Sequence, residues 1–404
     1  MSGRPKAIIV GGGIAGPAAA LALREVGVDA AVYEARGANG PDGGGLSLAP
    51  NGMNVLARLG LAERVRAAGS VVRDCCYRNH RGRRLAAHPY GRAEKYGQPT
   101  VIVTRAALHG VLSGALVDRN IPVHYDKRLT GVADTTDGRV VATFADGSTA
   151  EGDFLVGADG IQSAVRRAVF PGGPEPEFVG LIGYGGVVPA VMASPPDPDD
   201  RGRLNCTFGP DGFFGYCNIG EDPLTWMWWV NVARDEPLSR DELRAPFSAA
   251  ERQSLLARFS GWCPPTGAFI RASEDVLRVN IFDVQYLPTW SKGRTLLIGD
   301  AAHAMSPNSG LGASIALEDA LYLVHLMGES RAGLKDVFRR FEADRRGRVE
   351  KINTEARKMA ANKKPLGRVA VRLRDAFLSL AMPWIGERSL DWKFRYRVPG
   401  AAGR

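Results

Sequence analysis

The sequence predicts an α/β protein in which a Rossmann-like nucleotide-binding domain is interrupted by a mainly antiparallel β-sheet domain and followed by a helical C-terminus. Three observations support this fold class. A strand, a Gly-rich turn and a helix open the chain, two later apolar strands each end in Gly and Asp, and an aromatic region with hairpin signals lies between those strands. At 404 residues the chain is longer than one core usually grows, so we expect two domains or one domain with an insertion.

The composition is that of a globular protein, with 45% hydrophobic and 24% charged residues. No apolar run reaches the ~18 residues that a spanning helix needs, and Met1 is followed almost at once by Ala7–Val10 and glycines, without the pattern of a signal peptide. We therefore expect a cytoplasmic protein without a transmembrane segment. The five cysteines show neither C-x-x-C nor metal-ligand spacing, which argues against a disulfide framework and a metal site.

The net charge of +9 comes from the C-terminal part of the chain, because residues 331–404 contain 20 Lys and Arg against 8 Asp and Glu. Aromatic residues do not alternate with these basic residues as in RNA-binding proteins, and no zinc or recognition-helix pattern occurs. We therefore expect a solvated helical surface and no nucleic-acid partner.

The N-terminal strand Ala7–Val10 leads directly into a G-x-G-x-x-G turn and an Ala- and Leu-rich helix. In this context Gly11 permits the tight turn, Gly13 lets a pyrophosphate approach the backbone, and Gly16 lets helix and strand pack closely. The helix start at Ile14 and Ala15 supplies free N–H groups and a partial positive charge. The unit therefore predicts a dinucleotide site, and the alternative is a Gly-rich turn that binds no ligand.

An acidic residue stands at the expected distance after this turn. The second strand, Ala30–Tyr33, ends in Glu34, which lies 23 residues after Gly11 and is expected to accept hydrogen bonds from the adenosine ribose. Ala35 and Arg36 follow it and are expected to line the same part of the site.

Two later motifs separate an FAD site from an NAD site, since both cofactors present ADP to the first unit. The strand Phe154–Val156 is followed by Asp159 and Gly160, and the strand Thr295–Ile298 is followed by Asp300. Each acid stands at the carboxyl end of a strand, where open α/β sheets bind ligands. The alternative for each aspartate is an N-cap or turn residue.

We infer a discontinuous nucleotide domain from residues 1–175 and 285–345, a substrate-binding β-sheet domain from 176–284, and a C-terminal helical segment from 346–404. In the middle region, a strand would place Trp226 and Trp228 on one face, opposite Met227, Trp229 and Asn231. The candidate substrate contacts are Leu48, Phe208, Phe214, Tyr216, Trp226 and Trp228. The alternative for each is ordinary sheet core.

These strands show no evident buried Arg or Lys, which favours a sizeable, weakly charged aromatic or polyketide-like substrate over a small benzoate.

Taken in order, these motifs resemble the single-component FAD-dependent aromatic hydroxylases typified by p-hydroxybenzoate hydroxylase. The resemblance covers most of residues 5–350. It implies FAD as the cofactor, with Asp300 at the ribityl chain, Arg105 beside the phosphate and ribityl portion, and Asp159–Gly160 serving FAD and the nicotinamide donor. It also implies that Asp42–Leu48 lines one edge of the flavin, and that a loop covers the ring with Pro307, Gly310, Leu311, Gly312 and Ala313.

The resemblance further implies that NAD(P)H reduces the flavin and that O2 then forms a C4a-hydroperoxide, which hydroxylates or epoxidises an electron-rich substrate. The flavin carries this chemistry, so no catalytic side chain is obligatory. His303, beside Asp300, is the one candidate for a general base, and a structural role is the alternative.

Two residues depart from the family pattern, since Leu311 and Ser314 stand where many relatives carry Gln and Asn. A polar contact to the flavin is then lost or replaced by backbone. The alternatives are a flavin reductase or dehydrogenase, a halogenase, favoured by Trp226-Met-Trp228, and a relative without activity. The basic, amphipathic C-terminus is expected to pack on its own FAD domain, with a dimer contact or a membrane surface as alternatives. The protein is expected to be a monomer or a homodimer.

Overall fold

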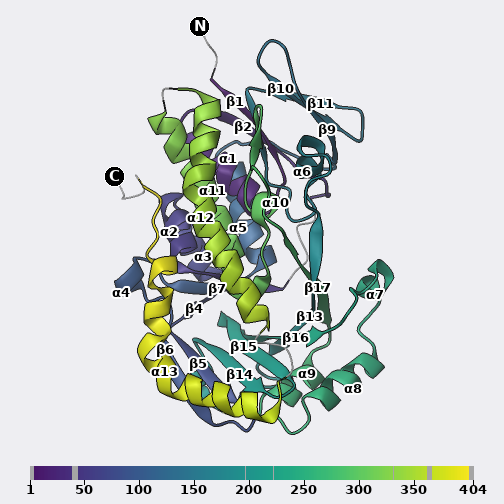
Figure 1. The fold of residues 1–404 in the computed structure, drawn as a ribbon, viewed down its shortest axis with the longest axis vertical. Helices are drawn as coiled ribbons and strands as arrows, with labels where there is room; N and C mark the ends of the chain where they lie inside the picture. Colours follow the sequence, from purple (N-terminus) through teal and green to yellow (C-terminus); the bar gives the residue numbers. More distant parts are fainter. Residues whose placement is uncertain are drawn as a thin grey trace.

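The computed structural model describes residues 4–38, 44–195, 197–221, 223–330, 332–361 and 366–399. Four sheets and several helices form an elongated molecule with the N-terminus near one end and the large sheet at the other (Figure 1). The predicted α/β fold class is confirmed.

The nucleotide sheet is mostly parallel. Its order is β18 (Ser291–Lys292), β19 (Thr295–Leu297), β12 (Phe154–Gly157), β1 (Lys6–Val10), β2 (Asp29–Tyr33) and β8 (Val123–His124), and β18 alone pairs antiparallel. The central strands β1, β12 and β19 are short, apolar and almost entirely buried, as expected for parallel strands covered on both faces. β12 and β19 come from either side of the predicted insertion, as expected.

Helices cover this sheet and connect its strands. They are α1 (Ala15–Glu25), α5 (Arg105–Asp118), α6 (Ala164–Val169), α10 (Asp300–His303), α11 (Gly312–Glu329) and α12 (Leu334–Ala361). α1 follows β1 directly and packs against α11, which in turn packs against α12. Smaller helices, α2 (Pro50–Arg58), α3 (Ala62–Ala67) and α4 (Ala93–Tyr96), lie beyond them.

Two small antiparallel sheets complete this half. One contains β11 (Thr149–Gly152), β10 (Val140–Phe144) and β9 (Leu129–Asp134), and the other contains β3 (Gly45–Leu48), β7 (Thr100–Thr104) and β4 (Ser70–Val72). The second of these lies between the nucleotide sheet and the large sheet, because Met227 of the large sheet contacts Gly45 of β3.

The large sheet is mainly antiparallel, as predicted. Its order is β17 (Val276–Val284), β13 (Pro176–Pro189), β16 (Leu224–Ala233), β15 (Gly212–Glu221), β14 (Arg203–Gly209), β5 (Asp74–Asn79) and β6 (Arg84–Pro89), with one parallel pair, β14 and β5. The sequence did not indicate β5 and β6 as part of it. It also did not indicate α7 (Arg240–Arg244), α8 (Ala249–Arg258) and α9 (Thr266–Ala272), which lie between β16 and β17.

The two faces of the large sheet have different neighbours. Its outer face packs against α8 and α9 through Phe214, Tyr216, Trp226, Trp228 and Val230. Its inner face turns toward β3 and β7 and carries Met227, Trp229 and Asn231 on β16 and Leu277 and Val279 on β17. The division follows from the period of two along a strand.

The predicted boundaries at 175, 285 and 345 stay a prediction. Residue 345 falls inside α12, and β5 and β6 join the large sheet from before residue 176. α13 (Arg368–Phe394) packs mainly on β6 of the large sheet and also touches α2. α12 packs on α11, and Phe394 at the end of α13 lies in the core of the nucleotide half, so the C-terminal segment contacts both parts of the molecule. No helix in the described ranges is long and apolar enough to span a bilayer.

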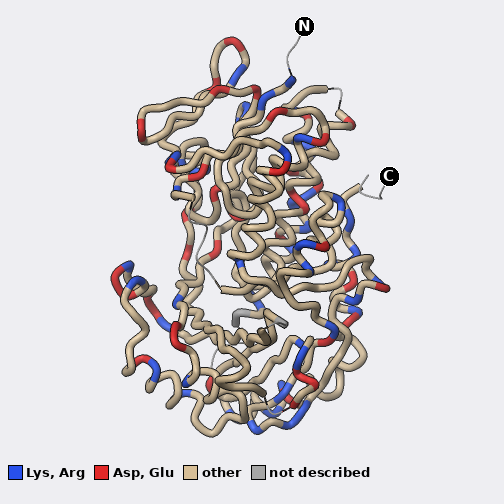
Figure 2. The backbone as a smooth tube through the Cα atoms, turned by 180° about the vertical axis from the view of Figure 1, so that it is seen from behind, with Lys and Arg blue, Asp and Glu red and all other residues tan. Residues whose placement is uncertain are grey.

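The basic C-terminal part is not simply a solvated surface. Figure 2 shows its basic residues interspersed with acidic ones along one side of the molecule. Arg345 is fully buried, with Nη1 2.6 Å from Glu318 Oε2 and Nε 2.8 Å from Asp319 Oδ1. Arg348 donates two further hydrogen bonds to Glu318, at 2.8 and 3.0 Å. Part of the positive charge therefore pairs with acids inside the fold.

Replacing Arg345 with Met is expected to destabilise the protein by about 3–5 kcal/mol, because Glu318 and Asp319 would keep buried negative charges without their main partner. Equilibrium urea unfolding measures the loss. Arg339→Met is the matched control on the same helix, since the Arg339 side chain is 72% exposed and pairs only with Asp336, and it should cost less than about 0.5 kcal/mol. Equal losses in the two variants would contradict the structural role of Arg345.

Candidate functional site

The Gly-rich turn lies between β1 and α1 and contains two structural glycines. Gly11 has φ +113°, and a Cβ there would collide with the backbone of Ala158. A Cβ at Gly16 would collide with Gly11 O. Gly13 differs, because a Cβ there would meet no atom of the described residues within 4 Å. The turn is therefore close-packed at Gly11 and Gly16 and open at Gly13.

The amino end of α1 begins at Ala15 with Ile14 as N-cap, and no side chain in the described ranges caps it. The free N–H groups and the helix dipole together form an anion-binding position. Since this position lies beside the open side of Gly13, the turn fits the pyrophosphate of a dinucleotide.

Glu34, just after β2, closes the same turn. Its carboxylate accepts hydrogen bonds from Gly12 N at 2.6 Å and from Arg36 N at 2.9 Å. A carboxylate has about four acceptor positions, so acceptor capacity remains for ribose hydroxyls. Ala35 is half-buried and Arg36 exposed at the end of this strand.

Asp159 makes most of its hydrogen bonds within local structure. It accepts hydrogen bonds from Ser163 Oγ at 2.5 Å and from the N–H groups of Ala164 and Val165 at 2.7 and 3.0 Å, at the start of α6. Burial raises the pKa of Asp159, while these bonds oppose the shift. Asp159 therefore accepts from the first N–H groups of α6, next to the N-cap residue Ser163, and Gly160, with φ +76°, has open space beside it.

Arg166, which sequence reasoning did not single out, connects the two aspartate motifs. Its buried guanidinium donates to Ala301 O at 3.0 Å and to Ile161 O at 2.7 Å. Burial lowers its pKa. The sequence signal that could have indicated a buried Arg166 was its position in the otherwise apolar first turn of a predicted helix.

Asp300 contrasts with Asp159. Within the described residues its side chain has no hydrogen-bond partner, although it begins α10 beside Gly312. Burial raises its pKa, and nearby His303 and Arg105 act in the opposite direction. The residue is half-buried, so the free acceptor positions of its carboxylate remain reachable and suit a ligand with hydroxyl donors, such as a ribityl chain.

The predicted ring-covering loop follows α10. Pro307 begins a 3-10 turn to Ser309, Gly310 is left-handed at φ +63°, and Gly312 and Ala313 begin α11. Its outer residue Asn308 accepts a hydrogen bond from Asn231 Nδ2 at 2.7 Å. The loop is therefore tied to the inner face of the large sheet.

The two departures from the family pattern have packing roles here. Leu311 is 2% exposed in the core, and the buried Ser314 Oγ accepts a bond from Ala49 N at 3.0 Å. Ser314 packs so closely on Gly52 that a Cβ at Gly52 would collide with it, and this contact joins α11 to α2. Neither side chain of this pair is available as a polar contact to a ring.

Part of the predicted segment Asp42–Leu48 can be placed. Asp42 and Gly43 lie outside the described residues, and Gly44 O accepts a bond from Arg105 N at 3.1 Å. Ser47 lies beside Gly310, and its buried Oγ has no described partner. Leu48, a candidate substrate contact, is instead fully buried in the core of the nucleotide half.

The substrate contacts predicted on β15 and β16 need a correction. Phe214, Tyr216, Trp226 and Trp228 are at most 3% exposed and pack on the outer face against α8 and α9. Phe208 lies half-buried on the inner face, near Phe213 and Trp229. The packing of the four outer-face residues is that of ordinary sheet core, the alternative stated for each, because the alternation gives two aromatic faces and does not tell which one the helices cover.

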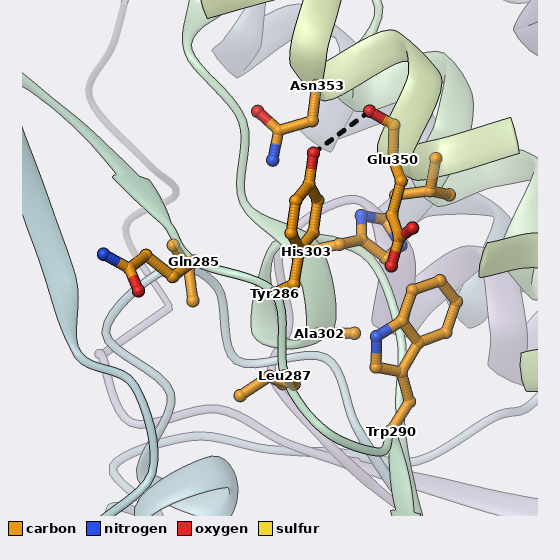
Figure 3. A pocket seen from close by; sticks show the side chains of 10 residues that line it. Gln285, Tyr286, Leu287, Trp290, Ala302, His303, Glu350 and Asn353 are labelled. Atoms are coloured by element: carbon orange, nitrogen blue, oxygen red, sulfur yellow. Dashed lines mark hydrogen bonds between the residues drawn. The ribbon is translucent and has the colours of Figure 1, made fainter. Parts of the chain in front are cut away.

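His303, the last residue of α10, lines a small pocket. Its Nε2 lies 2.7 Å from Asp319 Oδ2, and its ring centroid is 5.0 Å from that of Trp290. Figure 3 shows it with Tyr286 and Asn353, among the residues that line the pocket. The bond to Asp319 and the packing on Trp290 give His303 a structural role in this conformation.

Three motifs therefore converge at one edge of the nucleotide sheet. Gly11 touches the Ala158–Asp159 backbone, and a Cβ at Gly299 would approach both Ala15 of α1 and Ala316 of α11. The site combines an anion position, a ribose acceptor and the unsatisfied Asp300 in the order of a dinucleotide's groups. No group of His, Cys, Asp and Glu in the described ranges is arranged to hold a metal ion.

Comparisons with known proteins agree with this geometry. A family model described as an FAD binding domain matches residues 4–356. 6-Hydroxynicotinate 3-monooxygenase of Bordetella bronchiseptica is 30% identical over 384 residues, which cover 90% of this chain and 94% of that protein. FAD-dependent urate hydroxylase of Klebsiella pneumoniae is 32% identical over 368 residues, or 87% and 89% of the two chains. The crystal structure of Klebsiella pneumoniae HpxO with FAD and uric acid superimposes with a TM-score of 0.82 at 28% identity, covering 98% and 97%.

Gly13→Ala and Gly16→Ala are expected to separate binding from folding. The first places a methyl group in open space, so the cofactor-free protein should keep its unfolding free energy while FAD affinity falls at least about tenfold. The second drives a methyl group into Gly11 O and should destabilise the fold by about 1–3 kcal/mol. Flavin fluorescence titration and urea unfolding measure the two effects, and unchanged FAD affinity in Gly13→Ala would contradict the assigned cradle.

Asp300→Asn is expected to weaken FAD binding while stabilising the cofactor-free protein at pH 7. Because the folded-state pKa of Asp300 is raised, the folded state binds more protons than the unfolded state above about pH 4, and stability falls as pH rises through that window. Asn removes this cost, so the stability difference should disappear at pH values below about 4. A variant less stable than wild type at pH 7 without cofactor would argue against an unsatisfied carboxylate.

Proposed function

The chain belongs to the family of single-component FAD-dependent aromatic hydroxylases, and from this we propose that it uses NAD(P)H and O2 to hydroxylate a weakly charged aromatic or polyketide-like small molecule. The cofactor is FAD, and the enzyme is a flavin-dependent monooxygenase. The nicotinamide donor, the class of substrate and the outcome at its ring are the proposed parts, with epoxidation as a variant of the same oxygen transfer.

Bound FAD supplies the redox chemistry, accepting electrons from a nicotinamide donor and delivering them to dioxygen. In the proposed site, Gly13 and the start of α1 hold the pyrophosphate and Glu34 holds the adenosine ribose. Asp300 accepts hydrogen bonds from the ribityl hydroxyls, with Arg105 nearby to offset negative charge. The loop from Pro307 to Gly312 would cover the ring.

The proposal for the substrate rests on the residues of the inner face of the large sheet. Its members on the five strands β13 to β17 are Gly183, Gly185, Val187, Leu204, Cys206, Phe208, Phe213, Gly215, Cys217, Ile219, Met227, Trp229, Asn231, Leu277 and Val279. None of these residues is charged. Asp283, which continues the same alternation at the far end of β17, is buried and paired with Arg357 at 2.7 Å. Leu277 and Val279 remain 42% and 44% exposed, so apolar surface is available on this face.

This face lies next to the proposed flavin position. Asn231 bonds Asn308 of the ring-covering loop, and Leu277 approaches Gly44 at the start of β3. Trp229 and Met227 would therefore exclude water from one side of the reacting ring, and the Asn231–Asn308 pair would fix the loop relative to the substrate. Their contribution is orientation and desolvation.

The absence of charge on this part of the sheet favours a neutral substrate. A carboxylate such as that of 6-hydroxynicotinate, the substrate named for one relative, would be buried there without a cation on the inner face of β13 to β17, because Arg203 and Arg278 lie on the other alternation. A neutral ring with its own electron-donating substituents needs no such partner. This observation supports a larger apolar aromatic compound.

A stopped-flow screen tests the proposal directly. FAD-loaded enzyme is mixed with NADH or NADPH and with matched neutral and carboxylated phenols, and flavin reduction, oxygen uptake and product mass are followed. We expect a neutral compound to be converted with a gain of 16 Da. Turnover of carboxylated compounds alone, or oxidation of substrate without oxygen incorporation, would overturn the substrate class or the reaction.

Trp229→Ala and Trp228→Phe are matched substitutions on opposite faces of β16. Trp229→Ala should lower kcat/KM at least about tenfold and release more hydrogen peroxide, because water gains access to the ring. Trp228 is fully buried and donates to Ser273 Oγ at 2.7 Å, so Trp228→Phe should cost stability while leaving kcat/KM within about threefold. The reverse pattern would place the substrate on the outer face.

A further inference from the structure

α13 exposes a continuous apolar stripe. The stripe consists of Val369, Leu373, Phe377, Leu380 and Trp384, which are 71%, 67%, 55%, 75% and 76% exposed. Their spacing of four, four, three and four residues places them on one side of the helix. Figure 1 shows α13 along the lower edge of the molecule, outside the large sheet.

The opposite side of α13 is already packed against the protein. Val371 and Leu378 are buried, and Gly386 lies against the His88 ring of β6. Arg374 donates to Gly209 O at 3.1 Å, and Glu387 pairs with Arg92 at 3.0 Å. These contacts fix the rotation of the helix, so the stripe cannot turn inward without breaking them.

Scattered exposed apolar residues are ordinary, but an aligned row of five large ones is not. The row spans about 22 Å of helix at 1.5 Å per residue. Leu, Phe and Trp in such a row are typical of a helix surface that is covered by a second apolar surface, such as a partner protein or a lipid bilayer.

The charges beside the stripe indicate what kind of surface covers it. Arg368, Arg372 and Arg388 are exposed and have no described acidic partner. The acids of the helix are paired, Asp375 with Arg374, Glu387 with Arg92 and Lys95, and Asp391 with Lys95. The free charge around the stripe is therefore positive, and its partner should be apolar and anionic.

We propose that α13 binds the surface of an anionic lipid bilayer, with the stripe in the outer acyl region and Arg368, Arg372 and Arg388 at the headgroups. A bilayer offers both required properties in one plane, since it presents acyl chains beneath negative phosphates. A second copy of the same helix fits less well, because pairing two such stripes would bring equally basic flanks together. The binding is peripheral, since α13 keeps its other side on β6.

The test uses the full-length, FAD-loaded protein and vesicle flotation. Vesicles of neutral phosphatidylcholine are compared with vesicles containing about 30% phosphatidylglycerol, at about 50 mM and about 500 mM salt. We expect cosedimentation or flotation with the anionic vesicles at low salt, several-fold weaker binding at high salt, and little binding to neutral vesicles.

Three variants separate the parts of the surface. Leu380→Gln with Trp384→Gln removes apolar contact, and Arg372→Gln with Arg388→Gln removes charge; each pair should weaken anionic-vesicle binding at least about tenfold. Val117→Gln is the control, because Val117 is 73% exposed on α5, away from α13. Circular dichroism and flavin content should match wild type in all three.

Several outcomes would overturn the proposal. These are no binding to anionic vesicles, equal binding to neutral vesicles, or equal loss in the control variant. Sedimentation velocity adds a fourth, since a dimer that Leu380→Gln with Trp384→Gln converts to monomer would assign the stripe to a second copy of the chain.

Discussion

The buried ionic network around Arg345 holds together the elements that form the cofactor side of the molecule. Arg345 of α12 binds Glu318 and Asp319 of α11, and Asp319 in turn accepts bonds from Gly299 N at 2.9 Å and from His303. Interactions with His303 and Arg345 lower the pKa of Asp319 despite its burial. Because one carboxylate joins α10, α11 and α12, the turn that carries Asp300 is fixed from behind, and Asp300 itself stays available to a ligand.

Asp159 and Asp300 show how similar sequence contexts lead to different roles. Both follow a short apolar strand of the same parallel sheet, and burial raises the pKa of each. Asp159 receives three hydrogen bonds from the start of α6, whereas Asp300 receives none within the described residues. A carboxylate that accepts hydrogen bonds from the protein stabilises the fold. A carboxylate without such bonds can accept them from a cofactor. This distinction depends on where the neighbouring helix begins.

The large sheet performs two tasks with one pattern of alternation. Its outer face, with Trp226 and Trp228, anchors the sheet to α8 and α9, while its inner face presents Trp229 and Met227 toward β3. The Asn231–Asn308 bond then couples that inner face to the ring-covering loop. In the proposed function, β16 therefore connects the substrate side with the loop over the cofactor. The C-terminal helix supports the far edge of the same sheet at β6.

The sequence by itself determined the nucleotide half, because local constraints were sufficient there. Gly11 and Gly16 have no room for a side chain, Glu34 stands at the end of β2, and the two later strands carry their aspartates at the same edge. The family and its FAD cofactor followed from the order of these motifs and are confirmed.

Tertiary structure decided the rest. The strands β5 and β6 join a sheet formed mostly from residues about 100 or more positions later, and the face of β16 that meets the cofactor depends on where α8 and α9 pack. Arg345 lies in the part of the chain predicted to be a solvated surface, and Arg166 was not singled out, yet both are buried and bind acceptors from other segments. A strand pattern gives the alternation of side chains but not the identity of their neighbours, and a count of charges does not reveal which of them are paired. Those properties arise from long-range contacts.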